Sequence, residues 1–320
     1  MYIMLSNILI IKTYWRPIDG FTLVMVLVMA MVCCSSMAQT AKPGGHEHAA
    51  NVLREKHASL SAALANNVYG RPLSIDSIET SSRVTGNVYA VLDAPIAVVS
   101  SIKAPRQLCE VIILHINTKY CHATAPTSPS VLLVNFGKKI PQALSDTFDL
   151  EFVMTSNPPS PGFVQVSLNA VKGPLGTSDY AIEVAAIPLA DGKTFLHLTY
   201  SYGFGMAGRI AMQAYLATAG SSKVGFTQVA DAAQSQSKAK VYVGGMRGAV
   251  ERNTMRYYLA IDAYLQSLNA PQPEQQRLRL EKWFDSTEQY ALQLRETEKD
   301  SYIAMKKDEI TRQQSARPRL

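Results

Sequence analysis

The 320-residue sequence lacks the short motifs that mark the common catalytic sites. It contains no G-x-S-x-G nucleophile elbow, no H-E-x-x-H zinc motif and no Walker phosphate loop. Histidine is scarce, with six in the chain, and cysteine numbers only four. These absences give no support to a serine hydrolase, a zinc enzyme or a P-loop enzyme, and we expect no cofactor and no bound metal.

The sequence also lacks a strong excess of charge. It has 31 Lys and Arg against 25 Asp and Glu, for a net charge of +6. Proteins that bind nucleic acid carry clustered Lys and Arg, whereas a mild charge suits solubility. We therefore expect no nucleic-acid partner.

Long hydrophobic runs are missing except near the start of the chain. Lys12 and Arg16 precede an uncharged stretch over 21–32, and Ser36, Met37 and Ala38 have the small-residue pattern of a cleavage site. Twelve residues span only about 18 Å as a helix, whereas a bilayer core needs ~30 Å. We expect residues 1–38 to be a cleaved signal and the mature protein to be periplasmic or secreted.

A lipoprotein form is the alternative, because Cys33 and Cys34 lie near the cleavage site; the residue before Cys33, however, is Val32, where a small residue is wanted. No other stretch is apolar enough to span a membrane, so we expect membrane contact to be transient only.

The mature chain keeps two cysteines, Cys109 and Cys121. An even pair in an oxidising compartment predicts a disulfide, with two buried thiols as the alternative. Twelve extended residues would place the two ~40 Å apart, whereas a disulfide needs Cα atoms within ~7 Å. The chain must therefore reverse between them, near residues 115–119.

Hydrophobic spacing predicts a helix over 49–66 after a flexible leader, and a β-rich region from Ser81 onward. A strand over 84–92 is followed by a short helix that begins at Asp93. Further period-two runs cover residues 131–136, 148–154, 163–171, 180–187 and 194–202. Because these strands follow one another through short turns, they predict an antiparallel sheet.

The most regular helical pattern covers residues 246–268, after a short helix over 209–218. One face carries the apolar and aromatic side chains Val250, Thr254, Tyr257, Tyr258, Ile261, Tyr264, Leu265 and Leu268. Arg252 and Arg256 lie on the opposite face, where acidic residues of the final helix (Glu281, Asp285 and Glu288) or an anionic partner would balance them. We expect that last helix to cover 274–307 and its charged part beyond Arg295 to be exposed.

The stretch TYSYGFGMAGR places Gly203, Gly205 and Gly208 in the G-x-G-x-x-G spacing of dinucleotide-binding loops. Such a loop needs a parallel strand, a βαβ unit and an acidic residue ~20 positions on, and the sequence shows none of these. We interpret the glycines as a turn between a strand and a helix.

The histidines give weak signals. His46 and His48 form an isolated pair without a third metal ligand, and His197 falls on the polar face of its strand. His115, near the predicted reversal, is the one candidate acid or base, although a structural hydrogen bond is the simpler role.

The order of strand, short helix, antiparallel strands and long helix resembles the START-like or helix-grip superfamily of lipid-transfer proteins and polyketide cyclases. The resemblance lies in three segments, GNVYAVLDAPIAVVSSIKAP, DGKTFLHLTYSYGFG and GGMRGAVERNTMRYYLAIDAYLQSL, and covers about 60% of the chain. The cysteine segment CEVIILHINTKYC is also similar to an uncharacterised group of exported bacterial proteins.

The resemblance implies an α+β fold in which an antiparallel sheet wraps around the long C-terminal helix, with a hydrophobic cavity between sheet and helix. The sequence departs from the superfamily in the helix at Arg209 and in the extra helices at both ends. We expect a signal (1–38), an N-terminal leader and helix (39–80), the helix-grip domain (81–270) and a C-terminal helical extension and tail (271–320). The expected ligand-binding residues are Leu198, Tyr200, Tyr202, Thr254, Tyr257, Tyr258 and Ile261.

Three functions remain open. The first is binding or carrying a lipid-like or other hydrophobic small molecule. The second is a non-catalytic envelope protein that engages a protein partner through its C-terminal helix. The third is a cyclase or hydrolase that uses His115 or a tyrosine in the same cavity.

Overall fold

The computed structural model describes residues 44–124, 129–218, 223–229 and 241–315. The predicted signal over 1–38 and the last five residues of the chain lie outside them. Within this part of the chain, no helix has the length and apolar character needed to cross a bilayer.

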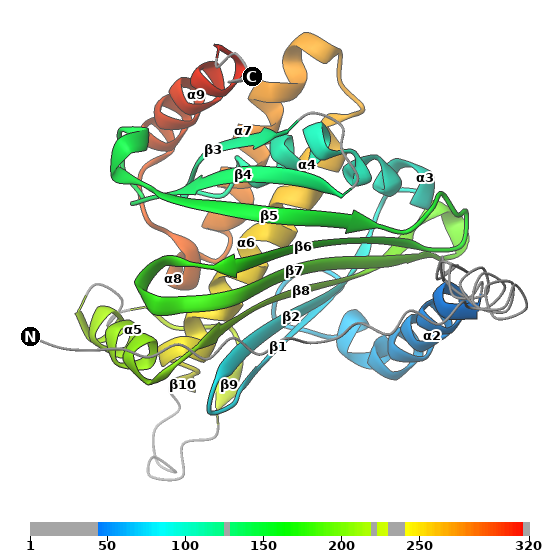
Figure 1. Ribbon diagram of the computed structural model, residues 1–320. Helices are drawn as coiled ribbons and strands as arrows, with labels where there is room; N and C mark the ends of the chain where they lie inside the picture. Colours follow the sequence, from blue (N-terminus) through cyan, green and yellow to red (C-terminus); the bar gives the residue numbers. More distant parts are fainter. Residues whose placement is uncertain (1–43, 125–128, 219–222, 230–240, 316–320) are drawn as a thin grey trace, which may run out of the picture. The chain divides into compact units, whose positions relative to one another are not determined.

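An eight-stranded antiparallel sheet forms the centre of the fold, with strand order β1-β2-β8-β7-β6-β5-β4-β3 (Figure 1). The strands are β1 (Leu73–Glu79), β2 (Arg83–Leu92), β3 (Thr118–Ala123), β4 (Ser130–Phe136), β5 (Phe148–Ser156), β6 (Val164–Lys172), β7 (Thr177–Pro188) and β8 (Thr194–Phe204). A second, two-stranded sheet pairs β9 (Gln228–Val229) with β10 (Val241–Tyr242). The predicted antiparallel strands are confirmed, and β1 and β3 join them as strands that the pattern missed.

The long helix α6 (Gly245–Ser267) lies against one face of the sheet, over β1, β2 and β8. Gly86 in β2 permits this contact, because an added Cβ would lie 2.6 Å from Oγ1 of Thr254 on α6. A side chain at that position would push the helix away from the sheet. The predicted helix-grip α+β class is confirmed by this arrangement.

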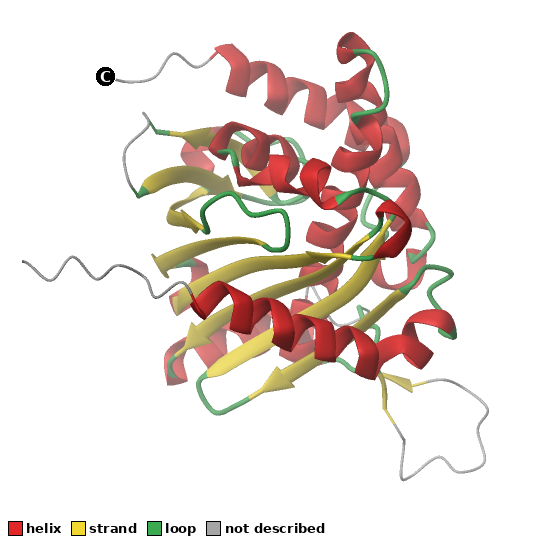
Figure 2. Cartoon of the chain, turned by 90° about the vertical axis from the view of Figure 1, so that its right-hand side faces the viewer, coloured by secondary structure: helices red, strands yellow, loops and turns green. Residues whose placement is uncertain are grey.

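The opposite face of the sheet is covered in part by α2 (Gly44–Ala65), which crosses the strands in Figure 2. Leu53 and Leu64 of this helix pack with Phe163, Ile187 and Phe195 in a separate small core. The helix expected over 49–66 therefore begins earlier, at Gly44. Shorter helices complete the order: α3 (Ile96–Val99), α4 (Pro105–Ile112), α5 (Met206–Thr218), α7 (Gln272–Glu288), α8 (Ala291–Leu294) and α9 (Lys299–Ser315).

The single last helix expected over 274–307 is wrong, because the chain breaks into α7, α8 and α9. The expected exposed tail beyond Arg295 is also wrong, since Tyr302, Met305 and Ile310 of α9 are buried. Lys306 and Glu309 are buried beside them and form an ion pair with each other. Charged residues interrupt the apolar stripe on the buried face of α9. The spacing of apolar residues therefore did not predict that this helix is buried.

The glycine-rich stretch joins β8 to α5, and β8 pairs antiparallel with both neighbours, which confirms that it is no dinucleotide loop. Packing explains why position 208 is a glycine, because an added Cβ would lie 2.5 Å from the carbonyl oxygen of Gly176.

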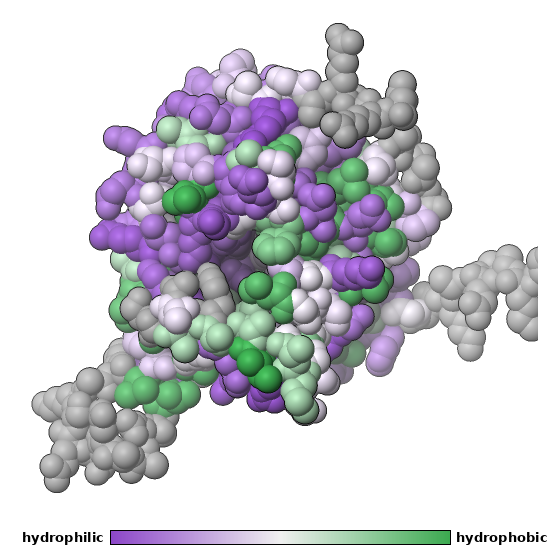
Figure 3. Space-filling model, turned by 60° about the vertical axis from the view of Figure 1, so that its left-hand side comes forward, coloured by the Kyte–Doolittle hydropathy of each residue, from purple (hydrophilic) through white to green (hydrophobic). Residues whose placement is uncertain are grey.

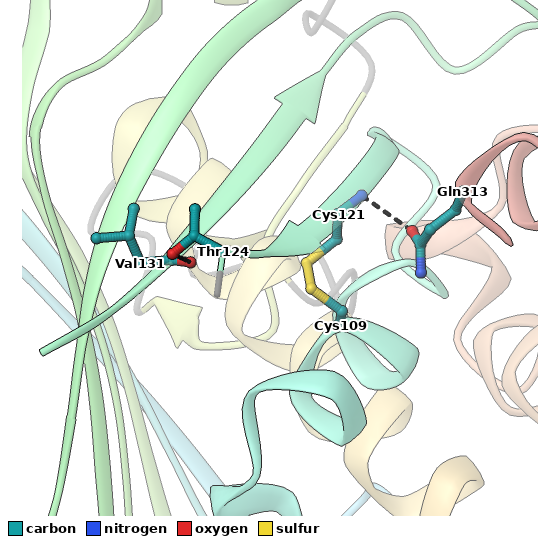
Figure 4. The surroundings of a disulfide bond; sticks show 5 residues. All are labelled: Cys109, Cys121, Thr124, Val131 and Gln313. Carbon is teal, nitrogen blue, oxygen red and sulfur yellow. Dashed lines mark hydrogen bonds between the residues drawn. A yellow bond between two sulfur atoms is a disulfide. The ribbon is translucent and has the colours of Figure 1, made fainter. Parts of the chain in front are cut away.

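The predicted disulfide between Cys109 and Cys121 is confirmed, with Cα atoms 5.3 Å apart (Figure 4). It joins α4 to β3, and the chain reverses between them through residues 113–117. The backbone N–H of Cys121 donates to the side chain of Gln313 on α9, at 2.9 Å. The disulfide therefore lies where α4, β3 and the C-terminal helix meet.

Candidate functional site

All seven expected ligand-binding side chains are buried. The structure brings three of them together, Tyr200 and Tyr202 from β8 and Tyr257 from α6. Tyr180 of β7 joins them, although the sequence did not single it out. We call these four residues the tyrosine cluster.

The rings of the tyrosine cluster are in contact. Tyr180 stacks on Tyr202 with ring centroids 5.3 Å apart, and Tyr200 lies 5.7 Å from Tyr257 across the gap between sheet and helix. The hydroxyl groups of Tyr180 and Thr177 lie 2.8 Å apart. Aromatic rings at these separations attract one another and supply a large apolar surface with polar tips.

The other expected residues lie apart from the tyrosine cluster or make bonds of their own. Tyr258 faces the ion pair of Arg71 and Asp262, whose atoms lie 2.6 Å apart. Thr254 donates to the carbonyl of Val250 within α6. Leu198 and Ile261 are buried apolar residues of the same core. Consecutive helical residues project about 100° apart, so Tyr257 and Tyr258 reach different flanks.

His115 lies against the tyrosine cluster and is only 3% exposed. Its ring stacks on Tyr257 at 4.7 Å, and Nδ1 accepts a hydrogen bond from the backbone N–H of Asn117. A neutral imidazole that accepts at Nδ1 carries its proton on Nε2. Nε2 is buried, and the side chain of Asn253 is the hydrogen-bonding group beside the ring.

Asn253 of α6 lies beside both His115 and Tyr200 and remains half-buried. The sequence did not single it out, yet it precedes Tyr257 by four residues and so shares its side of the helix.

A cluster of charged side chains lies next to Asn253. Glu296 accepts from Arg256 at 2.7 Å and pairs with Lys139 at 2.6 Å and with Lys223 at 4.0 Å. We call these four residues the basic cluster. Arg256 was expected opposite the apolar face, with Glu281, Asp285 and Glu288 of the final helix or an anionic partner to balance it. It is buried and pairs with Glu296 in the segment after α8, because α7 and α8 cover that side of α6.

The pKa shifts at the site follow from burial and from positive charge. Burial, and then Arg256, Lys306 and Lys139, lower the pKa of His115 well below its ordinary value. Burial alone would raise the pKa of Glu296, but the surrounding cations hold it below its usual range. Burial raises the pKa of Tyr200, Tyr257 and Tyr180. The site is therefore a place of neutral His and Tyr beside a charged rim.

A groove of about 620 Å³ opens elsewhere, between α4, β3, α7 and α9. Cys109, Cys121 and Arg279 contribute to its walls, together with several glutamines. This groove is not the expected cavity, since it lies outside the space between sheet and α6. At the tyrosine cluster the expected cavity is not open, because the rings of Tyr200 and Tyr257 meet across that space.

Figure 3 shows a face of the molecule on which hydrophilic residues surround a hollow. Among the residues the structure describes, no group of three or more His, Cys, Asp or Glu side chains could hold a metal ion. The fold and the site define a helix-grip α+β protein with an aromatic interior and a basic cluster beside it.

No protein-family model and no curated protein matches the sequence. The chain is similar to several solved structures. The human StarD13 lipid transfer and protein localization domain has 9% identity over 45% of this chain and 76% of that one, with a TM-score of 0.31. Truncated norcoclaurine synthase from Thalictrum flavum has 10% identity over 45% and 89%, with a TM-score of 0.31. Ara h 8.0201 has 8% identity over 61% and 99%, with a TM-score of 0.34.

The helix-grip architecture of this chain is seen directly in its strand order and in the position of α6.

Proposed function

We propose that this protein is an exported binding or carrier protein for a hydrophobic or amphipathic small molecule, held between the sheet and α6 at the tyrosine cluster. The observation that carries the proposal is the tyrosine cluster, whose rings meet between the sheet and α6, with the polar side chains of His115 and half-buried Asn253 beside it.

Ligand sites combine a mostly apolar wall with a few polar groups that fix orientation. The tyrosine cluster supplies the wall, and Asn253 and the tyrosine hydroxyls supply the polar groups. An amide and a hydroxyl can each donate and accept hydrogen bonds. The preferred ligand therefore has an apolar body and at least one polar group.

Binding at this place requires side chains to move. Tyr200 and Tyr257 contact each other across the space that the ligand would occupy. Rotation of one ring opens that space, and the apolar body of the ligand replaces the ring contacts that are lost. We therefore expect the unliganded site to be closed and to open as the ligand binds.

The alternative of a cyclase or hydrolase receives less support from the same groups. A general base works best with a pKa near the operating pH. The pKa of His115 is far lower than its ordinary value, and the tyrosine pKa values are raised. At neutral pH these groups are suited to hydrogen bonding and do not exchange protons readily.

Native mass spectrometry of protein purified from its own compartment tests the proposal. We expect a small apolar molecule that co-purifies and that organic solvent extracts. Tyr257→Ala should reduce the amount bound, whereas Tyr258→Ala, on the other flank of α6, is the matched control and should retain it. The proposal fails if no molecule co-purifies and no hydrophobic probe binds, or if both variants lose the ligand equally while remaining folded.

A further inference from the structure

We propose that the groove between α4, β3, α7 and α9 binds an extended peptide, which pairs with the outer edge of β3 as an added strand. This site is separate from the tyrosine cluster, and the inference goes beyond the proposed function.

The first argument is the position and register of β3. It is the last strand of the eight-stranded sheet, next to β4, and an edge strand presents backbone N–H and C=O groups to which another strand can pair. In an antiparallel pair, residues that bond to the neighbouring strand alternate with residues that do not. The N–H of Thr124 donates to the carbonyl of Val131 next to it on β4. The alternation therefore turns the backbone groups of Ala123 and Cys121 away from β4.

The second argument is that these outward groups face the groove. Cys121 and Ala123 both line it. The N–H of Cys121 donates to Oε1 of Gln313 on α9 at 2.9 Å (Figure 4). This amide oxygen takes the place that a carbonyl of a neighbouring strand would have. The outward groups of Ala123 and the carbonyl of Cys121 are the ones that a peptide would engage.

The third argument is the size and lining of the groove. Its volume of about 620 Å³ falls within the range of about 300–1,000 Å³ that is usual for ligand sites. Buried Ile113, Leu114 and Ile310 line it beside the disulfide. Its exposed or half-buried glutamines come from α7 and α9: Gln272, Gln275, Gln276, Gln313 and Gln314.

This lining specifies the class of peptide. Successive side chains of a strand point to opposite faces, so a peptide paired with β3 directs every second side chain toward the buried apolar residues. The side chains between them lie toward the amides and solvent. The preferred peptide is therefore extended, with apolar residues alternating with polar ones.

The charged side chains of the groove are paired with one another. Arg106 and Arg279 both form ion pairs with Glu110, at 3.6 and 2.7 Å. Recognition then depends on backbone hydrogen bonds and apolar contact, and we expect the affinity to change little with salt.

The first test uses a capped pentapeptide with valine at positions 1, 3 and 5 and threonine at positions 2 and 4. Hydrogen exchange of the Ala123 amide, followed by NMR, should slow at least tenfold at saturating peptide. Two isomers, N-methylated at positions 2 and 4 or at positions 3 and 5, each lose the donors of one peptide edge. We expect one isomer to bind at least tenfold more weakly and the other within about twofold of the parent peptide.

The second test removes the donor from the protein. Ala123→Pro should bind the parent peptide at least tenfold more weakly, because proline has no N–H; an edge strand tolerates proline where its N–H points outward. Ala123→Ser keeps the N–H and is the matched control, with affinity close to that of the wild type. If Ala123→Pro does not fold, the methylated isomers on the wild-type chain decide the question alone.

Three results would overturn the inference. The first is no protection of the Ala123 amide at about 5 mM peptide. The second is an equal effect of methylation on both peptide edges. The third is a concentration-dependent dimer that Ala123→Pro abolishes, without peptide binding, which would assign the β3 edge to a second copy of the chain. None of these results concerns the tyrosine cluster, so the proposed function is tested independently.

Discussion

Glu309→Gln is the substitution whose effect on stability follows most directly from the structure. Glu309 lies between Lys119 and Lys306, with N–O distances of 3.0 and 2.7 Å. The lysine side chains are fully buried, and that of Glu309 is 2% exposed. Removal of the carboxylate leaves two buried ammonium groups without a counter-charge, which costs about 3–5 kcal/mol.

The lower part of that range applies here. Lys306 also donates to the carbonyl oxygens of His115 and Thr118, and Lys119 donates to that of Ile116. Backbone carbonyls stabilise part of the remaining charge, so we expect a loss of about 3 kcal/mol in the free energy of unfolding at pH 7.

The pH dependence has a definite sign. Burial lowers the pKa of Lys306 to about 8, against 10.5 in the unfolded chain. Between these values the unfolded state binds more protons, so the free energy of unfolding rises with pH. Without Glu309, which raises this pKa, Lys306 becomes neutral at a lower pH. The difference between wild type and Glu309→Gln should therefore shrink from pH 7 to pH 9.

Urea denaturation followed by tryptophan fluorescence measures this effect, because Trp283 stacks on Tyr302 of α9 at 4.8 Å. Asp308→Asn is the matched control, since Asp308 is the exposed neighbour of Glu309 and should change stability by less than about 0.5 kcal/mol. The reasoning is refuted if Glu309→Gln is as mild as Asp308→Asn, or if its effect grows above pH 8.

Three further predictions concern the covalent link, the glycine stretch and the outer face of the sheet. Replacement of both Cys109 and Cys121 by Ala should lower the free energy of unfolding by about 3 kcal/mol, as expected for a 12-residue separation. An unchanged free energy of unfolding in urea titration would contradict this. Gly208→Ala should lower the melting temperature by several degrees, because its Cβ would meet backbone, and an unchanged melting temperature would show that α5 can shift freely. Burial lowers the pKa of His197 to about 4, so between pH 6.5 and 4 the histidine is protonated in the unfolded chain and neutral in the folded one. The free energy of unfolding should therefore fall by at most about 3 kcal/mol as the pH falls through that window. Acid titration of unfolding should show a smaller fall for His197→Gln.

The sequence predicted the elements with a regular hydrophobic period. The strands from β4 to β8 and the helix α6 alternate or repeat over enough residues for the pattern to be distinct, and the spacing of Cys109 and Cys121 required the reversal that joins them. The pattern missed β1, because its exposed Ile78 breaks the alternation. It missed the packing of α9 because Lys306 and Glu309 are buried as a pair.

The site was predictable only in part. Tyr200, Tyr202 and Tyr257 were found from strand parity and helical spacing. Asn253 lies four residues before Tyr257 and so on the same side of α6, but as a polar residue it was not predicted to face the interior. The basic cluster gave no local signal, since Lys139, Lys223 and Glu296 come from separate segments and meet only in the folded chain. The polar side of the site therefore depends on tertiary contacts that no sequence window contains.

The most direct test of the central claim is the NMR spectrum of tyrosine rings labelled with ¹³C during titration with dodecanoate. The account predicts that the signals of Tyr200 and Tyr257 shift together and saturate, while that of Tyr258 stays in place. No shift of Tyr200 and Tyr257 at saturating ligand, or a shift of Tyr258 as large as theirs, would contradict it.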